Sequence, residues 1–193
     1  VRVIPEPSGA FVDIHPNVTY QVMLGWEGTA QIGEVECNPT AFPIYRQEVV
    51  TRLVNELGIN RVRIEVRAGH ENPVDFYTQF KVHRDENIYY RVVNESVNDN
   101  NDPRVANLAG FHFTELDHKE ETILGPMRAL LAARGERLYV NLTYVDFGAA
   151  AWEQASDPEE YAELIHTAFI HLRDRYGWVP DAVEISLEPD NSR

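Results

Sequence analysis

The chain is poor in cysteine and in positive charge, and it lacks a long hydrophobic run. Cys37 is the single cysteine among 193 residues, which excludes an intrachain disulfide and a cysteine metal cluster. Lys and Arg number 17 against 31 Asp and Glu, giving a formal net charge of -14. A charge of that sign argues against nucleic acid or an anionic membrane surface as a partner. No apolar run in the sequence is long enough to span a membrane, so we expect no membrane partner either.

Histidine is present but unpatterned. The seven histidines are scattered, with no His-x-His pair on an expected strand and no His-Glu-x-x-His sequence. We therefore expect no metal site, and no motif points to a cofactor.

What remains is the composition of one globular domain, with 44% hydrophobic and 25% charged residues. Hydrophobic periodicity predicts strands and helices in alternation. The expected strands are 20–26, 60–67, 137–144 and 182–188, and the expected helices are 45–57, 120–134 and 157–176. This order predicts parallel strands joined by right-handed crossovers.

Each expected strand has one apolar and one polar face. In 60–67, the apolar face consists of Val62, Ile64 and Val66, and the polar face of Arg61, Arg63, Glu65 and Arg67. A parallel strand covered by helices on both sides is apolar on both faces. The pattern therefore fits an open sheet with a bare face, or a barrel with a polar interior. We favour the barrel: an α/β fold forming the N-terminal half of a (β/α)8 TIM barrel, with four parallel strands and outer helices. We expect Arg63 and Glu65 to find partners on neighbouring strands rather than each other.

Two stretches are expected at the carboxyl ends of these strands, where ligands and catalytic groups collect. Glu188 stands on the polar side of the last strand, and Pro189 ends that strand. A Glu that only caps a turn is the alternative at this position. The long, polar segment 69–118 follows the second strand, so we expect it to form part of the rim, with a hairpin near 88–93.

Four stretches, taken in order and spacing, are similar to one known family. They are Tyr20-Gln-Val-Met-Leu-Gly-Trp-Glu-Gly28, Leu57-Gly-Ile-Asn-Arg-Val-Arg-Ile64, Tyr144-Val-Asp-Phe-Gly148 with Trp152, and Asp157-Pro-Glu-Glu-Tyr161 through Glu188-Pro189. The chain resembles the N-terminal half of the clan A (β/α)8 glycoside hydrolases, closest to the branch of glucosylceramidase-like, glucuronoxylanase-like and xylosidase-like enzymes. The likeness covers most of residues 17–191.

The resemblance implies an enzyme, a retaining O-glycoside hydrolase acting on a β-linked oligosaccharide, polysaccharide or glycoside. It implies that Glu188 is the catalytic acid/base, and it implies no cofactor and no metal. The substrate-binding residues that it implies are Trp26, Glu27, Arg63, Asp146, Trp152 and Asn191. A secreted or periplasmic location is favoured over a cytoplasmic one, although the sequence leaves the compartment open.

Two departures from the family pattern matter. Leu187 precedes Glu188 where the family has an Asn that bonds the sugar 2-hydroxyl. The family's nucleophile stands at the end of the seventh strand, whereas the fourth expected strand is the last one here. We therefore expect residues 1–193 to be a partial catalytic domain that needs the remaining half of the barrel, in the same polypeptide or in a second chain. Alone, the chain is expected to be unstable or inactive. The alternative is a non-catalytic carbohydrate-binding or scaffold relative.

Overall fold

The computed structural model describes residues 2–3, 12–32, 41–146, 150–152, 154–185 and 187. The strands are β1 (Arg2–Val3), β2 (Val12–Asp13), β3 (Trp26–Thr29), β4 (Ile59–Arg67), β5 (Tyr139–Val145) and β6 (Ala182–Glu184). The main helices are α1 (Ala41–Asn55), α2 (Phe76–His83), α3 (Glu86–Asn94), α4 (Thr114–Lys119), α5 (Gly125–Ala132) and α6 (Pro158–Tyr176). Short helical turns are η1 (Ala68–His70), η2 (Leu108–Gly110), η3 (Glu120–Leu124) and η4 (Gln154–Ser156).

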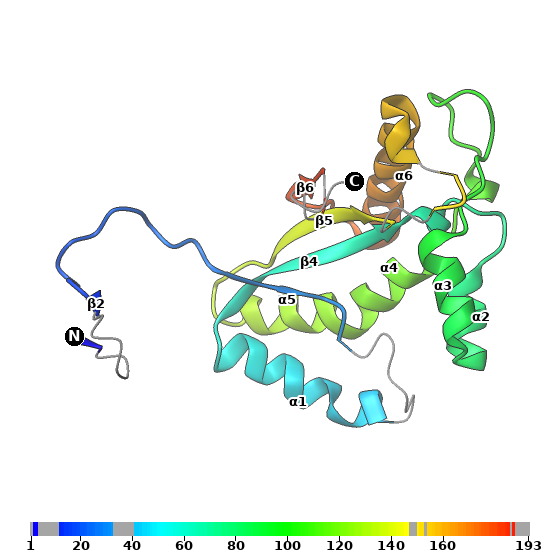
Figure 1. Cartoon of the computed structure of the whole chain (residues 1–193). Coiled ribbons are helices and arrows are strands. Elements are labelled where there is room, and N and C mark those ends of the chain that lie inside the picture. Colours follow the sequence, from blue (N-terminus) through cyan, green and yellow to red (C-terminus); the bar gives the residue numbers. More distant parts are fainter. Residues whose placement is uncertain are drawn as a thin grey trace.

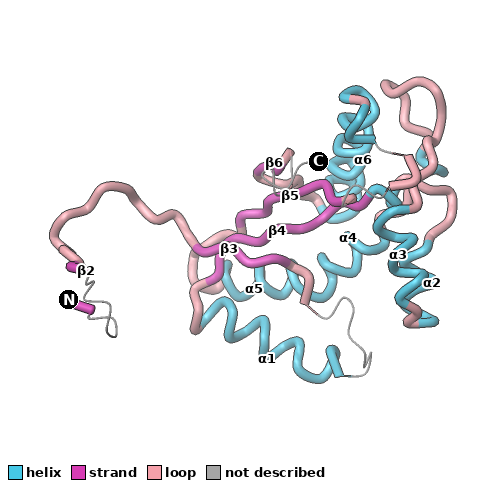
Figure 2. The backbone as a smooth tube through the Cα atoms, viewed as in Figure 1, coloured by secondary structure: helices cyan, strands magenta, loops and turns pink. Residues whose placement is uncertain are grey.

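The fold is α/β, built on a parallel sheet in the order β3-β4-β5-β6 (Figures 1 and 2). The longest pairing joins β4 to β5, from Arg61 opposite Tyr139 to Arg67 opposite Val145. The predicted parallel order of four strands is thus confirmed, because each strand–helix unit returns the chain to the same end of the sheet. Among the described residues, no helix combines the length and apolarity needed to cross a membrane.

The helices α1, α5 and α6 cover a single face of the sheet (Figure 1). The sheet contributes buried apolar side chains from β4 and β5, and α6 contributes Leu164, Ala168 and Leu172 to the same core. The sheet residues of this core include Val62, Ile64, Val66, Val140, Leu142 and Tyr144. Burying a Val, Leu or Ile side chain stabilises the fold by about 1.5–3 kcal/mol. The alternation in the sequence therefore identified the core face correctly. It places Arg63 and Glu65 on the opposite face, which meets α3 and α4 at its carboxyl end through Arg67.

The ends of α6 agree with the sequence signals. Asp157 precedes the helix, and its side chain accepts a hydrogen bond from the Glu159 amide at 3.0 Å. Pro158 follows at the first helical position. Gly177 ends the helix at φ 77°, a left-handed conformation that a side chain would disfavour.

The first core strand is not where the sequence predicts it. Residues 20–25 are not a strand, and their apolar side chains are exposed, Tyr20 by 93%. The strand β3 begins only at Trp26, where pairing with β4 starts at Ile59. Hydrophobicity alone therefore mispredicted this strand, because a strand needs a partner along its whole length. The segment before β3 runs away from the body of the molecule in Figure 1.

The hairpin predicted near 88–93 is also wrong, because this stretch is the helix α3. Asp85 caps the helix by accepting from the Asn87 amide, and the ring of Tyr89 packs 4.9 Å from that of Phe80 on α2. The apolar residues from Ile88 to Val93 fit both the two-residue period of a strand and the 3.6-residue period of a helix. The contact with α2 favours the helix.

The helix predicted at 120–134 begins earlier, at Thr114, and changes form within its length. The segment η3 is a π-helical turn between α4 and α5. Pro126 then stands in the first turn of α5, where its missing N–H does not break a helical bond. The sequence predicts a kink at this proline, and the structure accommodates the proline with the π turn that precedes it.

Candidate functional site

Polar side chains run along the open face of the sheet. Arg63 on β4 lies opposite Asn141 on β5, whose amide donates to Glu184 on β6 at 3.4 Å. Three neighbouring strands therefore place a guanidinium, an amide and a carboxylate on this face, with Glu184 two residues further along, opposite Thr143.

Along β4 the charged side chains pair with one another. Arg63 Nη2 lies 3.1 Å from Glu65 Oε1, and Arg67 Nη1 lies 2.6 Å from Glu65 Oε2. This corrects the expectation that Arg63 and Glu65 would find partners on neighbouring strands. Residues i and i+2 stand on the same strand face about 6.7 Å apart, a gap that the long Arg and Glu side chains close. Arg63 Nε, which is buried, has no acceptor within the part of the chain that the structure describes.

A second group of charges is buried where β4 ends. Glu115, from α4, lies 3.5 Å from Arg67 Nη2 and 3.2 Å from His70 Nε2. Arg67 also donates to the Tyr89 hydroxyl at 2.9 Å. Glu115 is only 1% exposed, so these partners replace the hydrogen bonds to water that its carboxylate has lost.

The loops that follow β4 and β5 meet through Glu71 and Gln154. Gln154 Nε2 donates to Glu71 Oε2 and to the Ala68 carbonyl, both at 3.0 Å, and the Asp99 amide donates to Glu71 Oε1 at 3.0 Å. Burial raises the pKa of Glu71 from 4.5 to about 7, against the lowering effect of the hydrogen bonds from Gln154 and Asp99.

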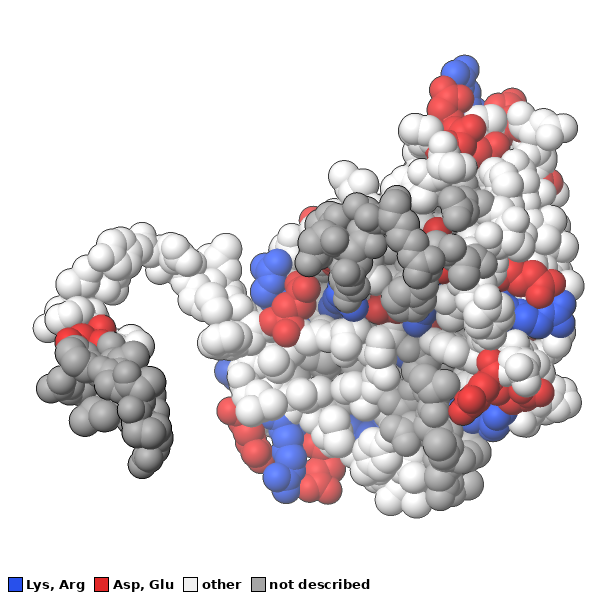
Figure 3. Space-filling model, in the orientation of Figure 1, with Lys and Arg blue, Asp and Glu red and all other residues white. Residues whose placement is uncertain are grey.

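Two further carboxyl groups, on α6, adjoin Glu71. Glu163 has its pKa raised to about 7 by burial and by the carboxylates of Asp99, Glu160 and Glu71. Glu160 accepts from the Asn98 amide at 3.2 Å. The carboxylate-rich end of the molecule is visible in Figure 3, where Asp and Glu side chains gather over α6. Among the described residues, no group of three or more acidic, histidine or cysteine side chains could hold a metal ion.

The segment after β4 lies at the carboxyl end of the sheet, where the sequence predicts a rim. The Val97 amide donates to the Glu71 carbonyl at 2.8 Å, and the Ala151 amide donates to the Asn94 carbonyl at 2.7 Å. Ser96 Oγ accepts from the Trp152 amide at 2.8 Å. These bonds hold Trp152, which is half-buried, against the rim formed by this segment.

The predicted site residues do not all come together. Asp146 and Trp152 lie in the loop after β5, where Asp146 Oδ2 is 3.1 Å from the Tyr144 hydroxyl. Trp26 and Glu27 lie at the opposite end of the sheet, because Trp26 pairs with the first residue of β4. The nine residues of β4 put Trp26 about 26 Å along the strand from Arg67. Glu27 pairs instead with Arg61 at 3.6 Å.

Glu188 and Asn191 lie outside the described residues, as do Cys37 and 147–149 of the third-strand stretch. Leu187 is described and is half-buried.

Sequence reasoning missed Glu71, Glu115 and Gln154 as members of the polar assembly. Glu65 was detectable, since it alternates with Arg63 and Arg67 on one strand face. The other three sit in the rim segment, in α4 and in η4, and no local pattern indicated that they would meet charged partners.

No protein-family model, no curated protein and no solved structure matches the chain.

Proposed function

We propose that this chain is the acid/base half of a retaining O-glycoside hydrolase that acts on a β-linked oligosaccharide, polysaccharide or glycoside. The observation that supports the proposal most is the one-sided parallel sheet. Helices cover its apolar face, and the polar side chains of Arg63, Asn141 and Glu184 lie on the other.

A charged sheet face of this kind fits the interior of a (β/α)8 barrel. A curling parallel sheet keeps its helices outside and its polar face inside, with the site at the carboxyl ends of the strands. Four further strand–helix units, from the same polypeptide or a second chain, would cover the charged face and pair the edges of β3 and β6.

The chemistry requires two carboxyl groups about 5–5.5 Å apart, one that attacks the anomeric carbon and one that exchanges a proton with the leaving oxygen and then with water. Glu188 is the proposed proton donor, and the nucleophile is proposed to come from the other half. Within the described residues, the buried Nε–H of Arg63 on this face has no acceptor, which suits Arg63 to hold that nucleophile as a carboxylate. Trp152, held against the rim, offers a ring on which a sugar can stack.

The test uses the completed enzyme with Glu188→Ala. An aryl glycoside with an activated leaving group needs no proton donor, so its glycosylation step should survive while deglycosylation slows, and azide should restore turnover. An unactivated glycoside should lose hydrolysis. Equal losses on both substrates with no azide effect would remove Glu188 from the acid/base role.

The competing function is a non-catalytic carbohydrate-binding relative, favoured by Leu187 in place of the family's Asn. Sugar binding that persists in the absence of any hydrolysis by the unaltered protein would support that function instead. Asp146→Ala and Trp152→Ala should weaken sugar binding under either function, because both residues lie in the loop after β5.

A further inference from the structure

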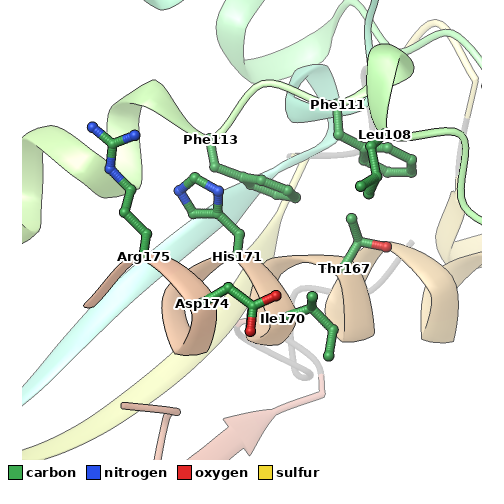
Figure 4. Close-up of a pocket in the computed structure, with 8 residues that line it drawn as sticks. All are labelled: Leu108, Phe111, Phe113, Thr167, Ile170, His171, Asp174 and Arg175. Atoms are coloured by element: carbon green, nitrogen blue, oxygen red, sulfur yellow. The ribbon is translucent and has the colours of Figure 1, made fainter. Parts of the chain in front are cut away.

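A pocket of about 370 Å³ opens in the helix layer, away from the charged face of the sheet (Figure 4). It lies between α6 and the segment 108–113, and it includes none of the residues assigned to the glycosidase site. Its lining consists of Leu108, Phe111, Phe113, Thr167, Ile170, His171, Asp174 and Arg175. The volume is that of a small-molecule site rather than of a groove for a helix.

The pocket has an aromatic wall. Phe111 and Phe113 stack with ring centroids 6.0 Å apart and an interplanar angle of 16°. The imidazole of His171 lies 5.1 Å from the ring of Phe113. In Figure 4, Leu108 and Phe111 stand at one end of the pocket, and His171 and Arg175 stand toward the other. An aryl ring placed between Leu108 and His171 would contact the rings of Phe111 and Phe113 along this wall.

The polar end is organised by Asp117, just behind the lining. Asp117 Oδ1 lies 2.7 Å from His171 Nε2, 3.0 Å from the Tyr176 hydroxyl and 3.4 Å from Arg175 Nε. Burial raises the pKa of Tyr176 to about 12, so its hydroxyl keeps the proton that it donates. Because Nε2 of His171 points at the Asp117 carboxylate, it carries the proton of that hydrogen bond, and in the tautomer that this geometry selects the lone pair is on Nδ1.

Within the described residues, His171 Nδ1 makes no hydrogen bond, and the side chain retains 24% exposure at the pocket. The lining also carries one carboxylate, Asp174, and one guanidinium, Arg175, whose charges balance. The pocket thus presents apolar walls, no net charge and one oriented acceptor.

We propose that this pocket binds a small, neutral, planar aromatic molecule with one O–H donor, a phenol. The ring packs against Phe111 and Phe113, and the phenolic hydroxyl donates to His171 Nδ1, which Asp117 holds in the accepting tautomer. The site is separate from the proposed glycosidase function and stands whether or not that function is correct.

The test is a titration of the full chain with 4-methylphenol and with 4-methylanisole, which has a similar shape but no O–H, followed by NMR of the histidine ring nitrogens. The phenol should bind about fivefold more tightly than the anisole, the ratio expected of one neutral hydrogen bond. It should shift the His171 Nδ1 resonance. His171→Phe should reduce that ratio to about one, and His166→Phe, an exposed position on the same helix, should leave it unchanged.

Leu108→Ala locates the site independently, since Leu108 is 68% exposed and its truncation spares the core. It should weaken both probes by a similar factor and keep their ratio. Equal affinities for the two probes in the unaltered protein, no binding of either, or no effect of Leu108→Ala would overturn the proposal.

Discussion

Gln154 donates from Nε2 to Glu71 Oε2 at 3.0 Å and so ties the loop after β5 to the loop after β4. The same amide nitrogen donates to the Ala68 carbonyl, and the Gln154 carbonyl oxygen lies 3.0 Å from the Tyr144 hydroxyl. Gln154 is fully buried, so each of these groups would be left without a partner if the side chain were removed. The two loops therefore behave as one unit at the carboxyl end of the sheet.

Gly69→Ala should separate this unit from α3. A Cβ at Gly69 would stand 2.3 Å from the Val92 carbonyl oxygen and 2.4 Å from that of Arg91, and backbone cannot give way as a side chain can. We expect a loss of about 2–3 kcal/mol in the free energy of unfolding, measured by urea denaturation. Gly28→Ala is the matched control, because a Cβ there meets nothing within 4 Å. Similar stabilities for the two variants would contradict the close approach of η1 and α3.

Stability should fall as the pH rises from about 4.5 to about 7. The pKa of Glu163 is raised to about 7 in the fold, so the folded state retains a proton that the unfolded chain releases near 4.5. The stabilising contribution is complete below pH 4.5 and is lost as the pH passes through 7. Thermal unfolding measured across this range tests the sign.

Glu163→Gln should flatten part of that dependence and raise stability above pH 7, since the amide cannot ionise. The remaining slope belongs to Glu71, whose pKa is also raised to about 7. Glu159→Gln, at an exposed position in the first turn of the same helix, should leave the pH profile unchanged. An unaltered profile in Glu163→Gln would show that the buried carboxyl ionises normally.

Arg67 and Glu115 should be energetically coupled. Removing either partner leaves an opposite charge buried, so Glu115→Leu and Arg67→Met should each cost about 3–5 kcal/mol. The double variant should cost less than the sum by at least about 1 kcal/mol, because it strands neither member of the pair. Additivity of the two changes in urea denaturation would argue that Glu65 and His70, rather than this pair, dominate the buried network.

Arg63→Gln should alter catalysis in the completed enzyme if the proposed function is correct. Loss of the guanidinium should raise the pKa of the nucleophile, which moves the acidic limb of the kcat/KM profile upward by about one pH unit. Arg61→Gln is the control, because Arg61 stacks on the Tyr139 ring at 3.7 Å near the amino end of β4. Equal shifts of the acidic limb in both variants would show that Arg63 acts only through the overall charge of the face and not on the nucleophile directly.

Sequence alone determined the features that depend on neighbours along the chain. Alternation in 60–67 separated the core face of β4 from its charged face, because successive strand residues point to opposite sides. Asp157 and Gly177 marked the ends of α6, because a capping carboxylate and a left-handed glycine satisfy backbone groups locally.

Tertiary structure decided what depends on partners distant in sequence. Strand β3 begins at Trp26 because β4 offers pairing only from Ile59 onward, and α3 is helical because it packs on α2. Glu115 meets Arg67 from a position 48 residues away, and Gln154 meets Glu71 from 83 residues away. The sequence around Glu115 and Gln154 does not indicate these contacts. Each contact forms only in the folded chain, where both partners are removed from water and hydrogen-bond to each other.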